Sequence, residues 1–133
     1  MEWLGSRVAG VVLAVASTAA MLYVGFYQSR VVERMWCPLL GGCEAVANAP
    51  FARLFGVPDG YLGAGLFATI ALLLAAAPGR PMVRATAVVG GAVAVYANVK
   101  GAYDMTNLGA HCTYCWATTL ASPWLMWIIW RLR

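Results

Sequence analysis

The amino-acid sequence predicts an all-α integral membrane protein, folded as one bundle of four transmembrane helices. The chain of 133 residues is 62% hydrophobic and only 11% charged, and its mean hydropathy of +0.74 is far above that of a soluble domain of its size. A membrane helix needs roughly 20 apolar residues to cross a hydrocarbon core of about 30 Å. Once the loops are subtracted, the chain has room for four such helices in a single domain, residues 1–133.

The charged residues argue against a nucleic-acid partner. The formal net charge is +4, but the nine Lys and Arg residues are scattered singly and form none of the basic stripes that bind nucleic acid. We therefore expect these cations to set the orientation of the chain in a lipid bilayer.

The first predicted membrane helix covers residues 8–27, a continuous apolar run. Small residues such as Gly10, Ala14 and Ala20 let neighbouring helix backbones approach closely, as helices in lipid require. The run is too long for a cleaved signal peptide and lacks the flanks of one, so we expect it to be retained.

A polar loop is predicted for residues 28–60, where charged residues, three prolines and two cysteines, Cys37 and Cys43, appear. Residues 44–55 place apolar side chains at helical spacing, which predicts a short amphipathic helix lying along the membrane interface. This helix is expected to cap the bundle as a lid.

The remaining membrane helices follow from apolar runs and turn signals. The second covers residues 61–77 and ends at a tight turn, Pro78-Gly79-Arg80-Pro81. The third covers residues 83–98 and is followed by a short polar loop over residues 100–111. The fourth covers residues 113–130.

Positive charge near the helix ends predicts the orientation. Residues on one predicted side are Arg7, Arg80, Arg84, Arg131 and Arg133, and those on the other are Arg30, Arg34, Arg53 and Lys100. Four acidic residues are interleaved with the second group, whereas only Glu2 accompanies the first. We therefore expect both termini to be cytoplasmic in a multi-pass protein of the cell (plasma) membrane, with all four cysteines on the extracytoplasmic face, where bacteria and archaea maintain oxidising conditions.

The motif Cys112-Thr113-Tyr114-Cys115 opens the fourth helix and is the strongest sign of chemistry. Two thiols separated by two residues can close a disulfide or hold a metal. Cys112 lies at the helix start, where unpaired backbone N–H groups and the helix dipole favour a thiolate. His111 can add positive charge when it is protonated.

The second pair, Cys37 and Cys43, lies in a loop made flexible by Pro38 and two glycines, Gly41 and Gly42. Such a loop can bring its thiols together and can also swing between partners. Two structural alternatives stand beside this redox interpretation: each pair is a static disulfide, or the four thiols bind zinc.

These features together resemble the vitamin K epoxide reductase family. The resemblance rests on the cysteine pair after the first span, the segment Cys43-Glu-Ala-Val, the stretch Phe51-Ala-Arg-Leu-Phe-Gly-Val-Pro58 before the second span, and the Cys-x-x-Cys that opens the fourth span. It extends from about Met1 to the end of the fourth helix.

The resemblance implies a four-helix bundle around a quinone of the menaquinone, ubiquinone or vitamin K type. Carried over by position, Cys115 attacks or reduces the quinone, Cys112 pairs transiently with Cys43, and Cys37 exchanges with a thioredoxin-like (DsbA-like) protein. Because the sequence contains no thioredoxin-like domain, that partner is expected to be a separate chain. Electrons then flow from secreted protein thiols to the membrane quinone, which supports disulfide bond formation.

The resemblance also suggests residues that bind the quinone. Asp59 stands where homologues often carry an Asn that hydrogen-bonds a quinone carbonyl, and it can donate this bond only when it is protonated. Thr119 stands where animal members often have Tyr. The aromatic residues Phe55, Tyr61 and Tyr114 are further candidates for lining the pocket.

Two other functions fit parts of the pattern. A heavy-metal transporter of the mercury-uptake type also uses cysteine pairs, but such proteins tend to carry a pair in the first span, and residues 8–27 contain no cysteine. A scaffold with structural disulfides leaves unexplained why a Cys-x-x-Cys opens a helix. A DsbB-type enzyme performs the same redox reaction, but its Cys-x-x-Cys lies in the first loop.

Overall fold

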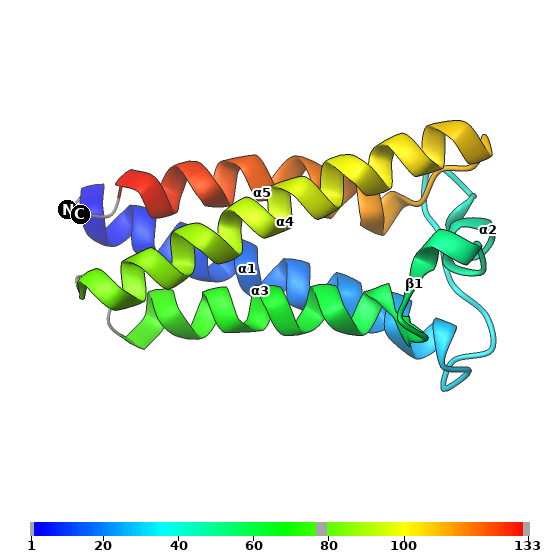
Figure 1. Ribbon diagram of the computed structural model, residues 1–133, viewed down its shortest axis with the longest axis horizontal. Helices are drawn as coiled ribbons and strands as arrows, with labels where there is room; N and C mark the ends of the chain where they lie inside the picture. The colour runs from blue at the N-terminus through cyan, green and yellow to red at the C-terminus, as the bar shows by residue number, and fades with distance from the viewer. Residues whose placement is uncertain (1, 77–79, 132–133) are drawn as a thin grey trace.

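The described residues form four long helices, which run side by side, and the cysteine-rich loop closes one end of them (Figure 1). The computed structural model describes residues 2–76 and 80–131. Its elements are α1 (Glu2–Gln28), α2 (Cys43–Ala47), the 3₁₀ turn η1 (Pro50–Ala52), β1 (Arg53–Leu54), β2 (Val57–Pro58), α3 (Asp59–Ala76), α4 (Pro81–Leu108) and α5 (Thr113–Arg131). The tight turn predicted at Pro78 and Gly79, and Arg133 of the predicted cytoplasmic group, lie outside the described residues.

The long helices confirm a predominantly helical membrane protein. Within the described ranges, three segments are long and apolar enough to cross a bilayer: Gly5–Gln28, Asp59–Ala76 and Pro81–Leu108. The fourth long helix, α5, has 19 residues, but it carries four tryptophans and five hydroxyl side chains and is not among these three segments. The prediction of four membrane spans therefore remains a prediction.

The helices pack through a central core and present apolar side chains outward. Phe67 and Ile70 of α3 and Leu125 and Ile129 of α5 are all at most 1% exposed. Outward-facing valines and leucines are common on the same helices, and they are Val8, Val12, Val15, Leu62, Leu72, Val89, Val93 and Leu120. Side chains of this kind suit a hydrocarbon surface, where apolar groups need no cover.

The C-terminal part of α1 and the N-terminal end of α3 meet at Gly60. A Cβ atom added at Gly60 would lie 2.4 Å from the backbone nitrogen of Gly25 and 2.8 Å from the carbonyl oxygen of Met21. Such distances are far inside van der Waals contact, so only glycine allows this approach of α3 to α1.

Gln28, the last residue of α1, links these helix ends to the loop. Its side chain is 4% exposed, and its Nε2 donates to Asp59 Oδ1 at 2.8 Å and to the Ala52 carbonyl at 3.2 Å. Its Oε1 accepts the backbone N–H of Gly60 at 3.1 Å. One buried amide therefore fixes the loop above the α1–α3 pair, because each of its polar atoms is satisfied there.

The loop corrects one prediction. A single helix over residues 44–55 is wrong: α2 ends at Ala47, with Asn48 as its C-cap, and Pro50 opens a separate 3₁₀ turn. Proline lacks a backbone N–H and disfavours helical geometry in the residue before it, so it interrupts the helix. Residues 53–58 then form a two-stranded antiparallel hairpin. The position of α2 at the membrane interface and its role as a lid remain predictions.

The polar loop predicted for residues 100–111 is also wrong in most of its length, because α4 continues to Leu108. Lys100 and Asp104 form an ion pair at 2.7 Å, one helical turn apart, a spacing that supports a helix. Met105 is 1% exposed and anchors the extended helix against the loop. Gly109, with φ 77°, ends it.

Candidate active site

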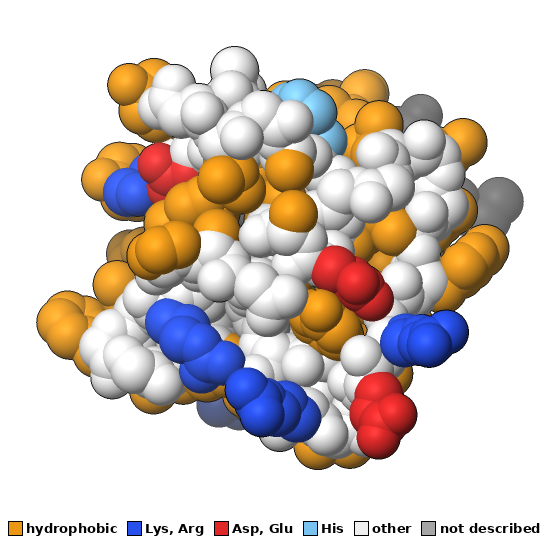
Figure 2. All heavy atoms as spheres, turned by 90° about the vertical axis from the view of Figure 1, so that its right-hand side faces the viewer, with side chains coloured by type: hydrophobic (Ala, Val, Ile, Leu, Met, Phe, Trp, Pro, Cys, Tyr) orange, Lys and Arg blue, Asp and Glu red, His pale blue; other side chains and the backbone are white. Residues whose placement is uncertain are grey.

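The start of α5 lies at the end of the bundle that carries α2 (Figure 1), and all four cysteines gather there in or against one buried cluster. Figure 2 looks onto this end, where charged and His side chains lie among hydrophobic ones. Cys43 and Cys112 are both 0% exposed and belong to one buried cluster with Met35 and Met105, against which Cys37 and Cys115 pack. The structure thus brings the two cysteine pairs near each other, although Cys43 and Cys112 are 69 positions apart in the sequence.

The loop pair is oxidised and the helix pair is reduced. Cys37 and Cys43 form a disulfide with Cα atoms 5.8 Å apart, whereas Cys112 and Cys115 are free thiols. A disulfide beside a dithiol is the starting arrangement for thiol–disulfide exchange.

Cys112 caps the start of α5, as the sequence predicts. Its carbonyl oxygen accepts the backbone N–H of Trp116 at 2.9 Å, and its Sγ accepts the N–H of Cys115 at 3.3 Å. Its own N–H points at the sulfur of Met105, 3.4 Å away. The side chain therefore occupies the position that Ser or Asp takes in other N-caps, where negative charge is favoured.

These contacts favour the thiolate form of Cys112. The hydrogen bond with the Cys115 thiol lowers the pKa of Cys112 below its ordinary value, and the backbone N–H groups of Cys115 and Tyr114 act in the same direction. Burial and the nearby Asp59 carboxylate oppose this by raising the pKa, but the net direction is downward. Cys112 is thus the sulfur of the pair that ionises more readily, and the thiolate is the reactive form of cysteine.

A pH titration checks this assignment. The ultraviolet absorbance of the Cys112 thiolate is expected to rise with pH at a midpoint below that of an ordinary cysteine, because a lowered pKa means that ionisation occurs at lower pH. In Cys115→Ala the largest favourable contact is lost, so the midpoint should move upward. A midpoint that stays in place in Cys115→Ala would show that the Cys115 thiol does not stabilise the thiolate.

Gly42 holds the loop disulfide against the start of α5. Its N–H donates to the carbonyl oxygen of His111 at 3.1 Å, and a Cβ atom at Gly42 would lie 2.6 Å from that oxygen. The close approach of these two backbones places Cys43, the next residue, inside the cluster that contains Cys112.

His111 contacts Trp116, one turn into α5. Nε1 of Trp116 donates a hydrogen bond to His111 Nδ1 at 3.1 Å, and the two rings lie with their centroids 5.9 Å apart. A role of His111 in stabilising the thiolate remains a prediction.

Three of the residues predicted to bind a quinone lie around the cysteines. The hydroxyl of Thr119 donates to the carbonyl oxygen of Cys115 at 2.7 Å, and the hydroxyl of Tyr114 donates to the carbonyl oxygen of Trp36 at 2.6 Å. The charge of Asp59 acts on Cys112. Their part in ligand binding remains a prediction.

The other two predicted ligand residues have different surroundings. Tyr61 packs edge-on against Phe26, and its hydroxyl lies 2.5 Å from that of Ser29. Phe55 is 96% exposed in the turn between β1 and β2, so it lines no buried pocket in this arrangement. Both also remain predictions.

Sequence reasoning missed Asn98, a polar residue in the interior face of α4. Its Oδ1 accepts the hydroxyl of Thr118 at 2.9 Å, and its Nδ2 donates to the Ala94 carbonyl at 2.7 Å. Thr118 is 1% exposed and follows Cys115 by three residues. An amide within an apolar run was the available signal, because polar groups inside membrane helices are costly and often functional.

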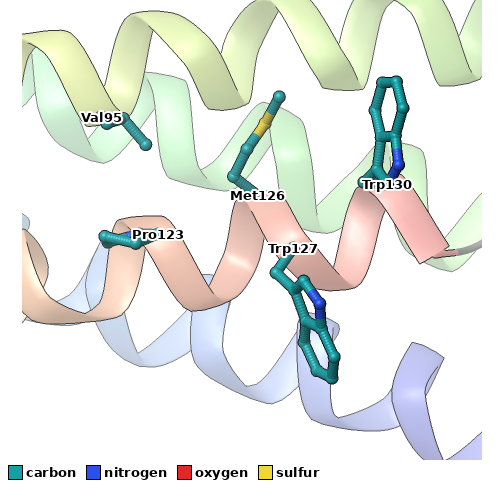
Figure 3. Close-up of a pocket in the computed structure, with 5 residues that line it drawn as sticks. All are labelled: Val95, Pro123, Met126, Trp127 and Trp130. Carbon is teal, nitrogen blue, oxygen red and sulfur yellow. The ribbon is translucent and has the colours of Figure 1, made fainter.

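An open apolar groove lies between α4 and α5, away from the cysteines (Figure 3). Its volume is about 380 Å³, and its lining residues are Val95, Pro123, Met126, Trp127 and Trp130. At a rise of about 1.5 Å per residue, Pro123 lies roughly 12 Å along α5 from Cys115. None of the predicted ligand residues lines this groove.

The described residues contain no group of three or more His, Cys, Asp or Glu side chains placed to hold a metal ion. The Cys37–Cys43 disulfide also occupies two of the four thiols that the zinc alternative would need.

A comparison with protein families gives one informative result. The model of the family described as the vitamin K epoxide reductase family matches residues 8–130. No curated protein matches the chain.

Proposed function

Because the chain belongs to the vitamin K epoxide reductase family, we propose that it is a membrane thiol oxidoreductase that transfers electrons from a separate thioredoxin-like protein to a quinone. The carrying observation is the burial of Cys43 and Cys112 in one cluster, with the loop pair oxidised and the helix pair reduced. The reaction oxidises the partner and so supports disulfide bond formation outside the cytoplasm.

The quinone is the electron-accepting substrate, of the menaquinone, ubiquinone or vitamin K type, and it takes up two electrons and two protons. The groups around Cys115 fit its polar carbonyls, because the hydroxyl of Thr119 and the amide of Asn98 meet there within otherwise apolar helices. Asp59, Tyr61, Tyr114 and Phe55 are further proposed contacts.

The reduced helix pair is the immediate electron donor. Cys115 lies on the side of the helix that carries Thr119, while Cys112 is held as the thiolate. When the pair gives up two electrons and the single proton of the Cys115 thiol, the Cys112–Cys115 disulfide forms, and the quinone takes its second proton from water. The hydrogen bond between the two thiols keeps their sulfurs in position for that bond.

The loop pair then restores the helix pair. Once the partner has reduced the loop disulfide, the Cys43 thiolate attacks Cys112, the Cys112–Cys115 bond breaks, and Cys115 leaves as a thiolate. Cys37 next attacks Cys43, which releases Cys112 and re-forms the Cys37–Cys43 bond. The chain returns to the state of the structure, and the partner has lost two electrons.

The proposal includes an orientation in the plasma membrane with both termini cytoplasmic and the cysteines extracytoplasmic. It is supported by the arginines at the end of the bundle opposite the loop, where Arg7 donates to the carbonyl oxygen of Leu74 at 2.9 Å and Arg84 lies near the end of α5. Cations near membrane-helix ends favour the cytoplasmic side.

Reconstitution tests the function directly. The purified protein is mixed with a reduced thioredoxin-like partner and a short-chain quinone, and quinone absorbance is followed together with partner thiols. We expect one quinone reduced per partner dithiol oxidised, and no reaction when either the partner or the protein is omitted. Absence of quinone reduction would overturn the proposal.

The electron path predicts a specific mixed disulfide. In Cys37→Ala/Cys115→Ala, which retains only Cys43 and Cys112, mild oxidation with diamide should give the Cys43–Cys112 bond in high yield, because both sulfurs lie in one buried cluster. Non-reducing mass mapping measures the yield. The matched control, Cys43→Ala/Cys115→Ala, leaves Cys37 with Cys112, and an equal yield from this control would contradict the path. In Cys37→Ala/Cys112→Ser the bond should be lost.

A further inference from the structure

Thr113, the residue after Cys112, reaches back to the loop disulfide. Its hydroxyl donates to the carbonyl oxygen of Pro38, accepts the N–H of Leu40 at 3.4 Å and lies 3.5 Å from the sulfur of Cys37. A side chain within the Cys-x-x-Cys motif thus contacts a cysteine of the other pair.

The neighbouring residue holds the same segment from the other side. The hydroxyl of Tyr114 donates to the carbonyl oxygen of Trp36, and the N–H of Trp36 donates to the hydroxyl of Tyr23 at 2.8 Å. The rings of Tyr23 and Tyr114 pack edge to face, with centroids 5.3 Å apart. The residues on either side of Cys37, Trp36 and Pro38, are therefore both hydrogen-bonded to α5, and the Cys37 sulfur stays beside the Thr113 hydroxyl.

Resting on the proposed function, we infer that Thr113 is a further catalytic residue, whose hydroxyl donates a hydrogen bond to the Cys37 thiolate whenever the loop disulfide opens. In the oxidised state the Thr113 hydroxyl donates its one hydrogen bond to the Pro38 carbonyl oxygen, because a disulfide sulfur is uncharged and a weak acceptor. A thiolate is a far better acceptor, since hydrogen bonds to charged groups are the stronger ones. Rotation of the Thr113 hydroxyl about its C–O bond redirects this hydrogen bond from the Pro38 carbonyl oxygen to the Cys37 sulfur.

The thiolate of Cys37 forms in a defined step. The first thiolate of the partner attacks Cys37, the Cys37–Cys43 bond breaks, and Cys43 leaves with the electron pair. The partner's second thiolate then attacks the partner sulfur of the mixed disulfide, and Cys37 leaves as a thiolate. The partner has lost two electrons and the loop pair has gained them. Thr113 stabilises this leaving group and, later, the same thiolate as it attacks Cys43.

Other ionisable groups surround this segment and must be considered in any titration. They are Tyr23 of α1, Glu44 of α2, whose Oε1 accepts the N–H of Met35 at 3.0 Å, and His111, Cys112, Tyr114 and Cys115 at the start of α5. Among the described residues, Thr113 is the one whose side-chain hydroxyl lies within hydrogen-bond reach of the Cys37 sulfur.

A single-cysteine chain isolates the effect. In Cys43→Ser/Cys112→Ser/Cys115→Ser, Cys37 is the only thiol, and its alkylation rate by iodoacetamide is measured against pH. Adding Thr113→Val should raise the midpoint by about one pH unit, and Thr113→Ser, which keeps the hydroxyl, should restore it. A looser loop would change the maximum rate but not the midpoint. An unchanged or lowered midpoint in Thr113→Val would overturn the inference.

A second measurement uses the chain with all four cysteines. Thr113→Val should slow reduction of the loop disulfide by dithiothreitol about tenfold at neutral pH, whereas a merely loosened loop would speed it up. Thr106→Val is the matched control, because Thr106 is exposed and its hydroxyl bonds only to the Ala102 carbonyl of its own helix. Equal or faster reduction in Thr113→Val overturns the inference. Neither readout needs a quinone, so failure of quinone reduction would count against the proposed function alone.

Discussion

Cys115→Ala is expected to lower partner-driven quinone reduction by at least about a thousandfold, the loss typical when a residue that forms the covalent bond of a reaction is removed. Without Cys115 the helix pair cannot store two electrons as a dithiol or release them by closing the Cys112–Cys115 bond. The variant also removes the contact that lowers the Cys112 pKa most, so the chain loses both its dithiol and the stabilisation of the Cys112 thiolate. Stopped-flow absorbance of the quinone gives the rate.

The size of the effect must be separated from damage to α5. Ala117→Ser is a suitable control, since it changes an exposed position two residues further along the same helix and leaves both thiols in place. We expect its rate to stay within about twofold of the unmodified chain. A Cys115→Ala rate within tenfold of the unmodified chain would contradict the assignment of Cys115 as the residue that faces the quinone.

Gly60→Ala is expected to be the most destabilising single methyl addition near the site. The new Cβ would meet backbone atoms of Gly25 and Met21 at 2.4–2.8 Å, and backbone cannot move aside as a flexible side chain can. Overpacking of this kind costs roughly 1–3 kcal/mol or more. Separation of α1 from α3 would also stretch the bond from Gly60 N–H to Gln28. Thermal unfolding in detergent, followed by circular dichroism, should show a clearly lower midpoint.

Gly65→Ala on the same helix provides the comparison. A Cβ atom at Gly65 meets no other atom within 4 Å, and alanine favours a helix over glycine by about 1 kcal/mol. Its unfolding midpoint is therefore expected to equal or slightly exceed that of the unmodified chain. Equal midpoints for the two alanine variants would show that α3 and α1 do not touch at Gly60.

Hydropathy was enough to find the long helices but not their ends. For most of the ends of α1 and α3, the apolar runs predict the position to within a few residues, because these helices begin or stop where polarity changes. Hydropathy fails at α4, where Lys100 and Asp104 look like loop residues in sequence yet pair along one helix face. It fails again at Pro50, where the helical spacing of apolar residues continues but the backbone cannot.

The candidate site divides in the same way. Spacing alone identifies Cys112 and Cys115 as a pair at a helix start, and the structure shows that start at Thr113. The supporting residues could not be predicted, because their partners are distant in sequence: Gln28 and Asp59 are 31 residues apart, and Thr113 and Pro38 are 75 apart. A hydrogen bond between such residues exists only once the helices have packed.

The thiol cap of α5 ties the chemistry of Cys112 to the folding of its helix. The Cys115 thiol and then the backbone N–H groups at the helix start lower the pKa of Cys112, so the ionised thiol stabilises this folded arrangement by the same free energy with which the arrangement stabilises the thiolate. This stability is complete above the unfolded pKa and is lost as the pH falls through the lower, folded value. Oxidation of Cys112 to a disulfide also removes the thiolate charge, as protonation does. If the pair is oxidised as the proposed function requires, we therefore expect the first turn of α5 to be less stable in the oxidised chain than in the reduced one.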